Sequence, residues 1–65
     1  MNYGDVLEVI GTPPENAHLL GRRCLFITEV APNGCYAKTI NDDVLRYFYY
    51  SELRLLTALD LMAEI

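Results

Sequence analysis

The sequence predicts a mainly β domain of five short strands followed by an apolar tail. Three stretches carry this prediction: a hairpin within residues 21–40, an alternating run at residues 5–10, and an aromatic run at residues 44–50. Each is rich in the β-branched or aromatic residues that suit a pleated, half-buried surface. With 65 residues, the chain has room for one domain with a small core.

The hairpin is the clearest of the three signals. Residues 21–40 read GRRCLFITEVAPNGCYAKTI, two strand-like runs around a turn at residues 31–34. This turn has proline where φ near −65° is favoured and Asn-Gly where φ can become positive. We therefore expect strands over residues 22–30 and 35–40, joined by a tight turn.

The first of these two strands does not alternate regularly. Leu25 and Ile27 share a face, and Val30 returns to that face only if a bulge lies near residues 28–29. Bulges bend and twist strands, as a small closed sheet requires. The sequence therefore predicts a bulged, curved strand.

The two cysteines, Cys24 and Cys35, lie in opposite strands of the hairpin. With the turn centred on residues 32–33, Cys35 sits opposite Val30. Cys24 then sits opposite Asn41, so the two thiols are roughly 20 Å apart at about 3.3 Å per residue. Because a disulfide needs Cα atoms within about 7 Å, we expect free thiols, as in a reducing compartment.

The first strand of the chain is expected at residues 5–10, DVLEVI. Leu7 and Val9 alternate with Glu8 there, which indicates one apolar face. The following residues, 11–20, contain two prolines, which remove backbone donors and fix φ. We expect a long loop over these ten residues.

The second half of the chain supplies the remaining strands. Residues 41–43, Asn-Asp-Asp, predict a second turn, and residues 44–50, VLRYFYY, predict the fourth strand. A one-turn 3₁₀ helix at residues 51–53 and a last short strand at residues 54–56 complete the sheet.

An alternative is an α+β fold, in which a hairpin packs on one long helix that begins near Asp43. Asp42 or Asp43 would cap that helix. Apolar side chains would share one helical face at Leu45, Phe48, Tyr49, Leu53, Leu56 and Leu59. The four consecutive aromatic residues favour the strand over the helix.

The sequence divides into a β domain over residues 1–56 and an apolar tail over residues 57–65. The tail reads TALDLMAEI, and its Thr57-x-x-Asp60 spacing is similar to a capping box. A helix of eight or nine residues is marginal in isolation. The tail is therefore expected to pack on its own domain or on another chain.

The order of three features resembles that of the small SH3-like barrels, including the KOW-type modules of transcription and translation proteins. Gly4-Asp5 opens a strand. Residues 21–23, Gly-Arg-Arg, lead through residues 28–30, Thr-Glu-Val, to the Pro-Asn-Gly turn, and residues 50–56, YSELRLL, close the sheet. The resemblance covers residues 4–56. It implies a five-stranded SH3-like barrel with a long first loop and a short 3₁₀ turn before the last strand.

The charge balance is acidic, with nine Asp and Glu against five Lys and Arg and a net charge of −4. Phosphate contacts supply most of the affinity for nucleic acid, so general binding to nucleic acid or to an anionic membrane is not expected. The alternative function is a KOW-like module of a nucleic-acid assembly. It would use Arg22, Arg23 and Lys38.

The sequence shows no convergence of catalytic groups, and we expect no enzyme activity, no cofactor and no metal site. Two separated cysteines and one histidine, His18, do not form a zinc site. The chain has no basic-led apolar run at its start and no stretch of roughly 20 apolar residues. We expect no signal peptide, no membrane span and a cytoplasmic location.

The aromatic run is the most informative functional feature. On a strand, two of its four aromatic side chains point outward, where they offer rigid amphipathic area for binding. The sequence therefore predicts a small, non-enzymatic interaction or accessory module that binds another protein or a second copy of itself. The predicted contact residues are Tyr36, Tyr47, Tyr49, Leu59, Met62 and Ile65.

Overall fold

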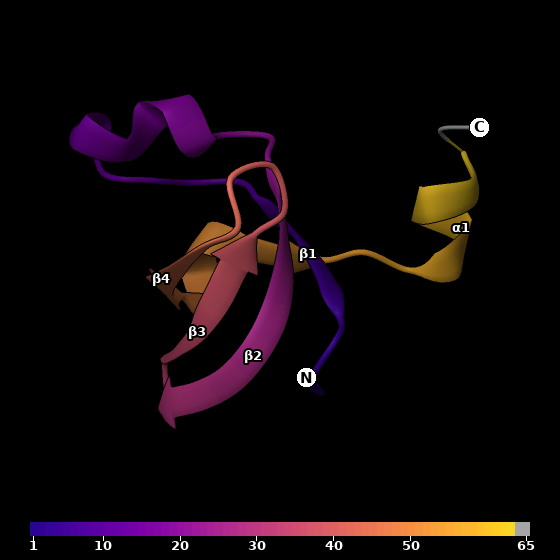
Figure 1. Ribbon diagram of the computed structural model, residues 1–65, viewed down its shortest axis with the longest axis horizontal. Coiled ribbons are helices and arrows are strands. Elements are labelled where there is room, and N and C mark those ends of the chain that lie inside the picture. The colour runs from indigo at the N-terminus through magenta and orange to yellow at the C-terminus, as the bar shows by residue number, and fades with distance from the viewer. Residues whose placement is uncertain (64–65) are drawn as a thin grey trace.

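The computed structural model describes residues 1–63, which form an antiparallel sheet of five strands and three short helices (Figure 1). The strands are β1 (Val6–Val9), β2 (Arg23–Ala31), β3 (Gly34–Thr39), β4 (Val44–Tyr49) and β5 (Leu53–Leu55). The helices are the 3₁₀ helices η1 (Pro14–Leu19) and η2 (Tyr50–Glu52) and the α-helix α1 (Ala58–Met62). The strand order is β4-β3-β2-β1-β5, so β4 and β5 are the two edges.

The predicted mainly β fold is confirmed, and the alternative long helix from Asp43 is wrong. β4 pairs with β3 along its whole length, from Gly34 opposite Tyr49 to Thr39 opposite Val44. The predicted 3₁₀ turn and last strand are both present, each one residue earlier than expected. Pairing with β3 buries Phe48 while its aromatic neighbours stay exposed, an alternation that a helix cannot provide.

The long connection predicted over residues 11–20 is present, but it contains a 3₁₀ helix, η1, that was not predicted. Pro14 stands at the start of η1, where its missing N–H costs nothing and its fixed φ suits a helix. η1 places Leu19 in the core. Gly21, with φ of +79°, then leads the chain into β2, and its N–H donates to the Val9 carbonyl at 2.9 Å.

The predicted tight turn is present, since Ala31 pairs directly with Gly34 across the intervening two residues. The expected positive φ is wrong, because neither Asn33 nor Gly34 has one. Glycine is needed at position 34 for another reason. A Cβ there would overlap the hydroxyl end of the Tyr47 ring and lie 3.0 Å from the Phe48 carbonyl oxygen.

The predicted bulge in the hairpin occurs at two places. Ile27 is the extra residue between the Phe26 and Thr28 pairs, and Val30 is the extra residue between the Glu29 and Ala31 pairs. Each bulge changes which β2 residues face the core. The buried face of β2 is therefore that of Phe26 rather than that of Ile27.

The two bulges also change the partners of the cysteines. Cys35 lies opposite Glu29 and Cys24 opposite Thr39, which corrects the predicted Val30 and Asn41. Both cysteines are free and buried. They belong to a core to which all five strands and η1 contribute, formed by Leu7, Val9, Leu19, Cys24, Phe26, Cys35, Ala37, Phe48 and Leu53.

A hydrogen-bonded cluster around Asp42 fixes the turn between β3 and β4. The buried Thr39 hydroxyl donates to the Asp42 carboxylate, which also accepts from the Val44 N–H at 3.2 Å and from Arg46 Nη2 at 2.9 Å. Asp43 completes the turn with a φ of 59°, a conformation that aspartate tolerates. The hydrogen bond from Thr39 is the main cause that lowers the pKa of Asp42 below its ordinary 3.8.

Among residues 1–63, no helix has the length and apolar character needed to cross a membrane.

We predict that Gly34→Ala destabilises the fold by about 1–3 kcal/mol, because the new methyl group overpacks against Tyr47 and the β3–β4 ladder. Urea unfolding measures this loss. Gly11→Ala is the matched control, since nothing lies within 4 Å of its Cβ position, and it should change stability by less than about 0.5 kcal/mol. Equal stability of the two variants would contradict the close approach at Gly34.

We predict that Asp42→Asn lowers stability at neutral pH and that the difference from the unsubstituted chain disappears in acid. A carboxyl whose folded pKa is depressed stabilises the fold above its unfolded pKa, and this contribution is lost as the pH falls through the folded pKa. Urea unfolding over a pH series, from about pH 7 downward through the folded pKa of Asp42, measures how the difference is lost. The control is Asp43→Asn, which removes the same charge from a more exposed carboxylate; an equal loss in both variants would contradict the role of Asp42.

Candidate protein-interaction face

The structure brings three predicted contact residues together on the outer face of the β3–β4 pair. Tyr36 lies on β3, and Tyr47 and Tyr49 lie on β4. The ring centroids are 6.1 Å apart for Tyr36 and Tyr47 and 5.3 Å apart for Tyr47 and Tyr49, with interplanar angles of 85° and 90°. These edge-to-face contacts define a tyrosine cluster whose members are 40%, 39% and 50% exposed, respectively.

Strand register explains the cluster. Tyr36 is directly opposite Tyr47, and Tyr49 follows Tyr47 on the same face by the two-residue period of a strand. Phe48 points the other way and is buried. Gly34 lies opposite Tyr49 and leaves room for the Tyr47 ring. The prediction that Tyr47 and Tyr49 point outward is confirmed.

A row of three aliphatic side chains and one lysine borders the cluster on the same face. Val6 pairs with Leu25, Leu25 with Lys38, and Lys38 with Leu45, so the four side chains run across β1, β2, β3 and β4. Leu45 is exposed, and the other three are half-buried. The tyrosines and this row together make a continuous outer surface of largely apolar side chains.

Two phenol groups of this region, those of Tyr47 and Tyr50, have raised pKa values. Loss of hydration, followed by the neighbouring phenol of Tyr49, raises the pKa of Tyr47. Tyr50 closes the end of β4, and its hydroxyl donates to Glu29 Oε1 at 3.0 Å. Loss of hydration and this hydrogen bond raise the pKa of Tyr50 to about 12. The Tyr47 hydroxyl, at the centre of the cluster, is therefore uncharged near neutral pH.

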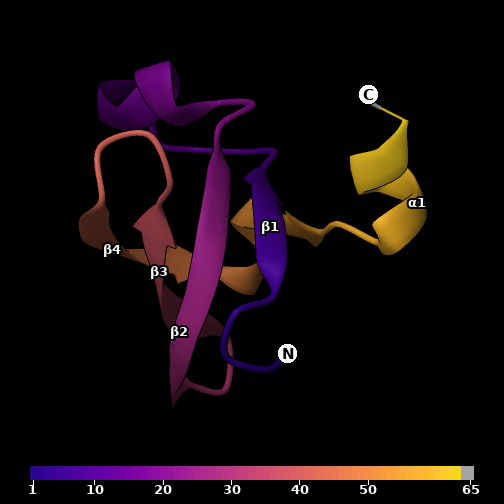
Figure 2. The ribbon, with the colours of Figure 1, turned by 45° about the vertical axis from the view of Figure 1, so that its right-hand side comes forward.

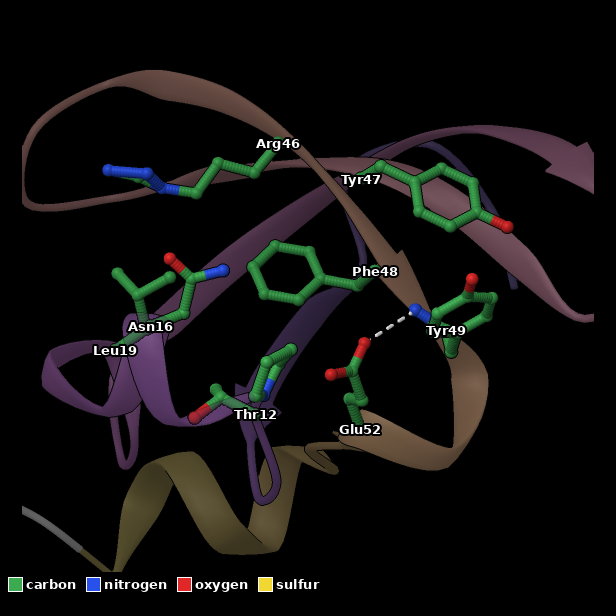
Figure 3. Close-up of a pocket in the computed structure, with 9 residues that line it drawn as sticks. Thr12, Asn16, Leu19, Arg46, Tyr47, Phe48, Tyr49 and Glu52 are labelled. Carbon is green, nitrogen blue, oxygen red and sulfur yellow. Dashed lines mark hydrogen bonds between the residues drawn. The ribbon is translucent and has the colours of Figure 1, made fainter.

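A pocket of about 310 Å³ lies at the free edge of β4, between that strand and η1 (Figure 3). Leu19 and Phe48 supply apolar walls, and its polar residues include Thr12, Asn16, Arg46 and Glu52. Sequence reasoning missed this pocket, because it joins residues 12–19 with residues 46–52. The only signal was the unusual length of the loop after the first strand, which does not show where that loop packs.

Two buried polar atoms of the pocket have no hydrogen-bond partner: Thr12 Oγ1 and Arg46 Nε. A buried polar group without a partner costs about 1–3 kcal/mol, so such groups normally hydrogen-bond to another molecule, water included. Arg46 uses Nη2 for Asp42 and leaves its Nε–H free. The pocket therefore offers hydrogen-bonding capacity that the described part of the chain does not use.

The structure places the predicted contact residues of the tail elsewhere. α1 follows β5 and stands apart from the sheet, on the side opposite β4 (Figures 1 and 2). Leu59 and Met62 are 77% and 66% exposed. Ile65 lies outside the described residues. The predicted contact set therefore divides into two separate surfaces, and α1 leaves the tyrosine cluster uncovered.

The tail forms a helix with the expected cap, but this helix has five residues rather than eight or nine. The Thr57 hydroxyl accepts the Asp60 N–H at 3.2 Å, and the Asp60 carboxylate accepts the Thr57 N–H at 2.9 Å, which is the capping box expected from the spacing. Arg54 joins α1 to the sheet, with ion pairs to Glu8 of β1 at 2.8 Å and to Asp60 at 3.5 Å.

The three basic residues of the nucleic-acid alternative come together only in part. Arg22 and Arg23 line the same shallow hollow at the start of β2. Lys38 lies on the outer face of β3 and pairs with Asp43 at 3.7 Å. The Asp43 carboxylate offsets the positive potential of Lys38 at this place. The use of these residues for nucleic acid stays a prediction.

Residues with catalytic or metal-binding potential are dispersed in the described part of the chain. No group of three or more His, Cys, Asp or Glu side chains in residues 1–63 could hold a metal ion. His18 is exposed at the end of η1. Burial raises the pKa of Cys24 to about 11 and also raises the pKa of Cys35, so both thiols are protonated near neutral pH.

Comparison with protein-family models, curated proteins and solved structures finds no match to this chain. Interpretation of its function therefore starts from the geometry of the tyrosine cluster, the pocket and α1.

We predict that both thiols of the folded chain react slowly with a thiol reagent such as iodoacetamide near neutral pH. The rise in the pKa of Cys24 from 9.0 to about 11 reduces its thiolate fraction by about a hundredfold, and burial restricts access further. Mass spectrometry of alkylated protein measures the rate. The chain unfolded in guanidinium is the control, and a thiol that reacts equally fast in both states would reveal an accessible, activated cysteine.

Proposed function

We propose that this chain is a non-enzymatic interaction module that binds a partner protein, or a second copy of itself, through the tyrosine cluster. The observation that carries the proposal is the edge-to-face packing of Tyr36, Tyr47 and Tyr49 on an exposed face. Rings held by each other lose little conformational freedom on binding, and each offers both apolar area and a hydroxyl. Tyrosine is accordingly enriched among the residues that dominate protein interfaces.

We propose further that the sheet is that of a small SH3-like barrel. Support comes from the strand order β4-β3-β2-β1-β5, the long connection between β1 and β2, and η2 immediately before β5. The bulges at Ile27 and Val30 add the curvature that closure of a small sheet requires. Because this fold hosts many unrelated functions, the functional proposal rests on the surface residues and not on the fold.

The exposed apolar side chains of α1 form a second proposed contact. Leu59 and Met62 lie on a short helix that makes few contacts with its own sheet. A helix of five residues is marginal without a partner surface, so binding would stabilise it. We place this activity in the cytoplasm, where free thiols such as Cys24 and Cys35 persist.

We predict that the double variant Tyr36→Ala/Tyr49→Ala loses a protein partner that the unsubstituted chain retains. The test is affinity capture from lysate of the source organism, after nuclease treatment, at low and at high salt. Tyr3→Ala is the matched control, because Tyr3 is 79% exposed and lies outside the cluster. The cluster should hold a discrete partner at both salt concentrations, since apolar contact is not screened, and the Tyr3 variant should behave like the unsubstituted chain.

Recovery that the cluster substitutions leave unchanged would contradict the proposal. Material that disappears with nuclease or with salt would instead support the nucleic-acid alternative, because phosphate-driven binding falls steeply with ionic strength. Arg22 and Arg23 would then be the residues to substitute. A third variant, Leu59→Ser/Met62→Ser, tests α1 separately, since both side chains are exposed and their replacement should leave the fold intact.

A further inference from the structure

β4 is an edge strand, and its hydrogen-bonding groups alternate between β3 and the free edge. The Tyr50 N–H donates to the Asn33 carbonyl at 2.9 Å, which fixes the phase of the ladder. In an antiparallel pair, directly opposed residues alternate between hydrogen-bonded and non-hydrogen-bonded pairs. The backbone N–H and C=O groups of Leu45, Tyr47 and Tyr49 therefore point away from β3, toward the free edge.

Glu52 confirms this direction and caps one end of the edge. Its Oε1 accepts the Tyr49 N–H at 2.9 Å, across the lower rim of the pocket (Figure 3). Within the described residues, no side chain caps the edge-facing N–H groups of Tyr47 and Leu45. Exposed edges of this kind are templates for pairing with another extended chain.

The pocket lies directly beside the uncapped part of the edge. Residues 46–49 of β4 form one side, and Thr12 and Asn16 form the other. The unpartnered Arg46 Nε–H is a donor, and the unpartnered Thr12 hydroxyl can donate or accept. Arg46 is already paired with Asp42, and the Glu52 carboxylate accepts the Tyr49 N–H, so the lining combines donors with acceptors.

We propose that the free edge of β4 accepts an extended segment of a partner protein as a sixth strand. The segment exchanges backbone hydrogen bonds with Tyr47 and seats an Asn or Gln side chain in the pocket. A carboxamide fits because it can accept from a donor such as Arg46 Nε or donate to an acceptor such as Thr12 Oγ1, whereas a carboxylate would add a second negative charge beside Glu52. This inference rests on the proposed function and adds to it the binding mode and the conformation of the partner.

A partner segment is favoured over a second copy of this chain pairing through β5. That other edge has three residues, and Arg54 at its centre is already paired with Glu8 and Asp60. Three residues are too few to pair along β4, which has six.

The test uses linear random peptides of about 12 residues, because this length exceeds that of a strand of about five or six residues. The peptides are displayed and selected for binding to the immobilised full chain. Selected peptides are synthesised and titrated against Leu45→Pro and Leu45→Ala. Proline removes the edge-facing N–H and leaves the ladder to β3 intact, and proline is tolerated on edge strands. We expect Asn or Gln at one enriched position and affinity for Leu45→Pro at least about tenfold weaker than for Leu45→Ala.

Amide hydrogen exchange of the unsubstituted chain gives a second measurement that does not depend on how Leu45→Pro folds. Bound peptide should slow exchange of the Tyr47 amide by at least about tenfold, because that amide gains a hydrogen bond. Unchanged exchange at Tyr47, failure to select any peptide, or equal affinity for the two Leu45 variants would overturn the inference. Protection that grows with the concentration of the chain alone would also overturn it, in favour of a second copy.

Tyr36→Ala separates this inference from the function on which it rests, since Tyr36 lies in the cluster but not in the pocket. Binding that is lost in Tyr36→Ala but equal in the two Leu45 variants would leave the interaction module standing and reject strand addition. Binding that Tyr36→Ala leaves intact and Leu45→Pro abolishes would support strand addition and reject the tyrosine cluster as the contact surface.

Discussion

The close approach of the Gly34 backbone to the Tyr47 ring is the constraint on which the outer face depends. Gly34 is buried, and the ring lies where a side chain at position 34 would stand. This contact holds Tyr47 between Tyr36 and Tyr49, which do not share a ring contact with each other. The absence of a side chain at one position therefore organises three side chains around it.

A single strand, β4, serves the core, the outer face and the pocket. Phe48 enters the core, Tyr47 and Tyr49 form the outer face, and Arg46 turns toward the pocket and Asp42. This multiple use follows from chain length, since a domain of 65 residues has a small core and few strands. Neighbouring residues of one strand therefore belong to different surfaces.

The sequence could predict the elements whose signals are local. The alternation of Leu7 and Val9 and the aromatic run of β4 gave correct strands, and the spacing of Thr57 and Asp60 gave the capped helix. Bulges were foreseen but not placed, because the register of β2 depends on which side chains the opposite strand accepts. A shift of register moved both cysteine partners.

The pocket and η1 could not be predicted from local sequence signals. Two prolines predicted a loop, yet a proline at the start of a helix is favourable, and only packing of Leu19 in the core distinguishes the two outcomes. The pocket joins segments more than 25 residues apart in the sequence, Thr12 to Leu19 with Arg46 to Glu52. The tyrosine cluster could be predicted in part. Alternation predicted that Tyr47 and Tyr49 point outward, but the contact between Tyr47 and Tyr36 depends on the register of β3 and β4.

The way α1 is attached makes it sensitive to salt, unlike the tyrosine cluster. Its ionic link to the sheet is the exposed guanidinium of Arg54, which Glu8 and Asp60 share. Ion pairs between exposed charges weaken as the ionic strength rises. The tyrosine cluster depends on edge-to-face ring contacts and on the space at Gly34, which salt does not screen. The two exposed surfaces of this chain therefore differ in the kind of interaction that positions them.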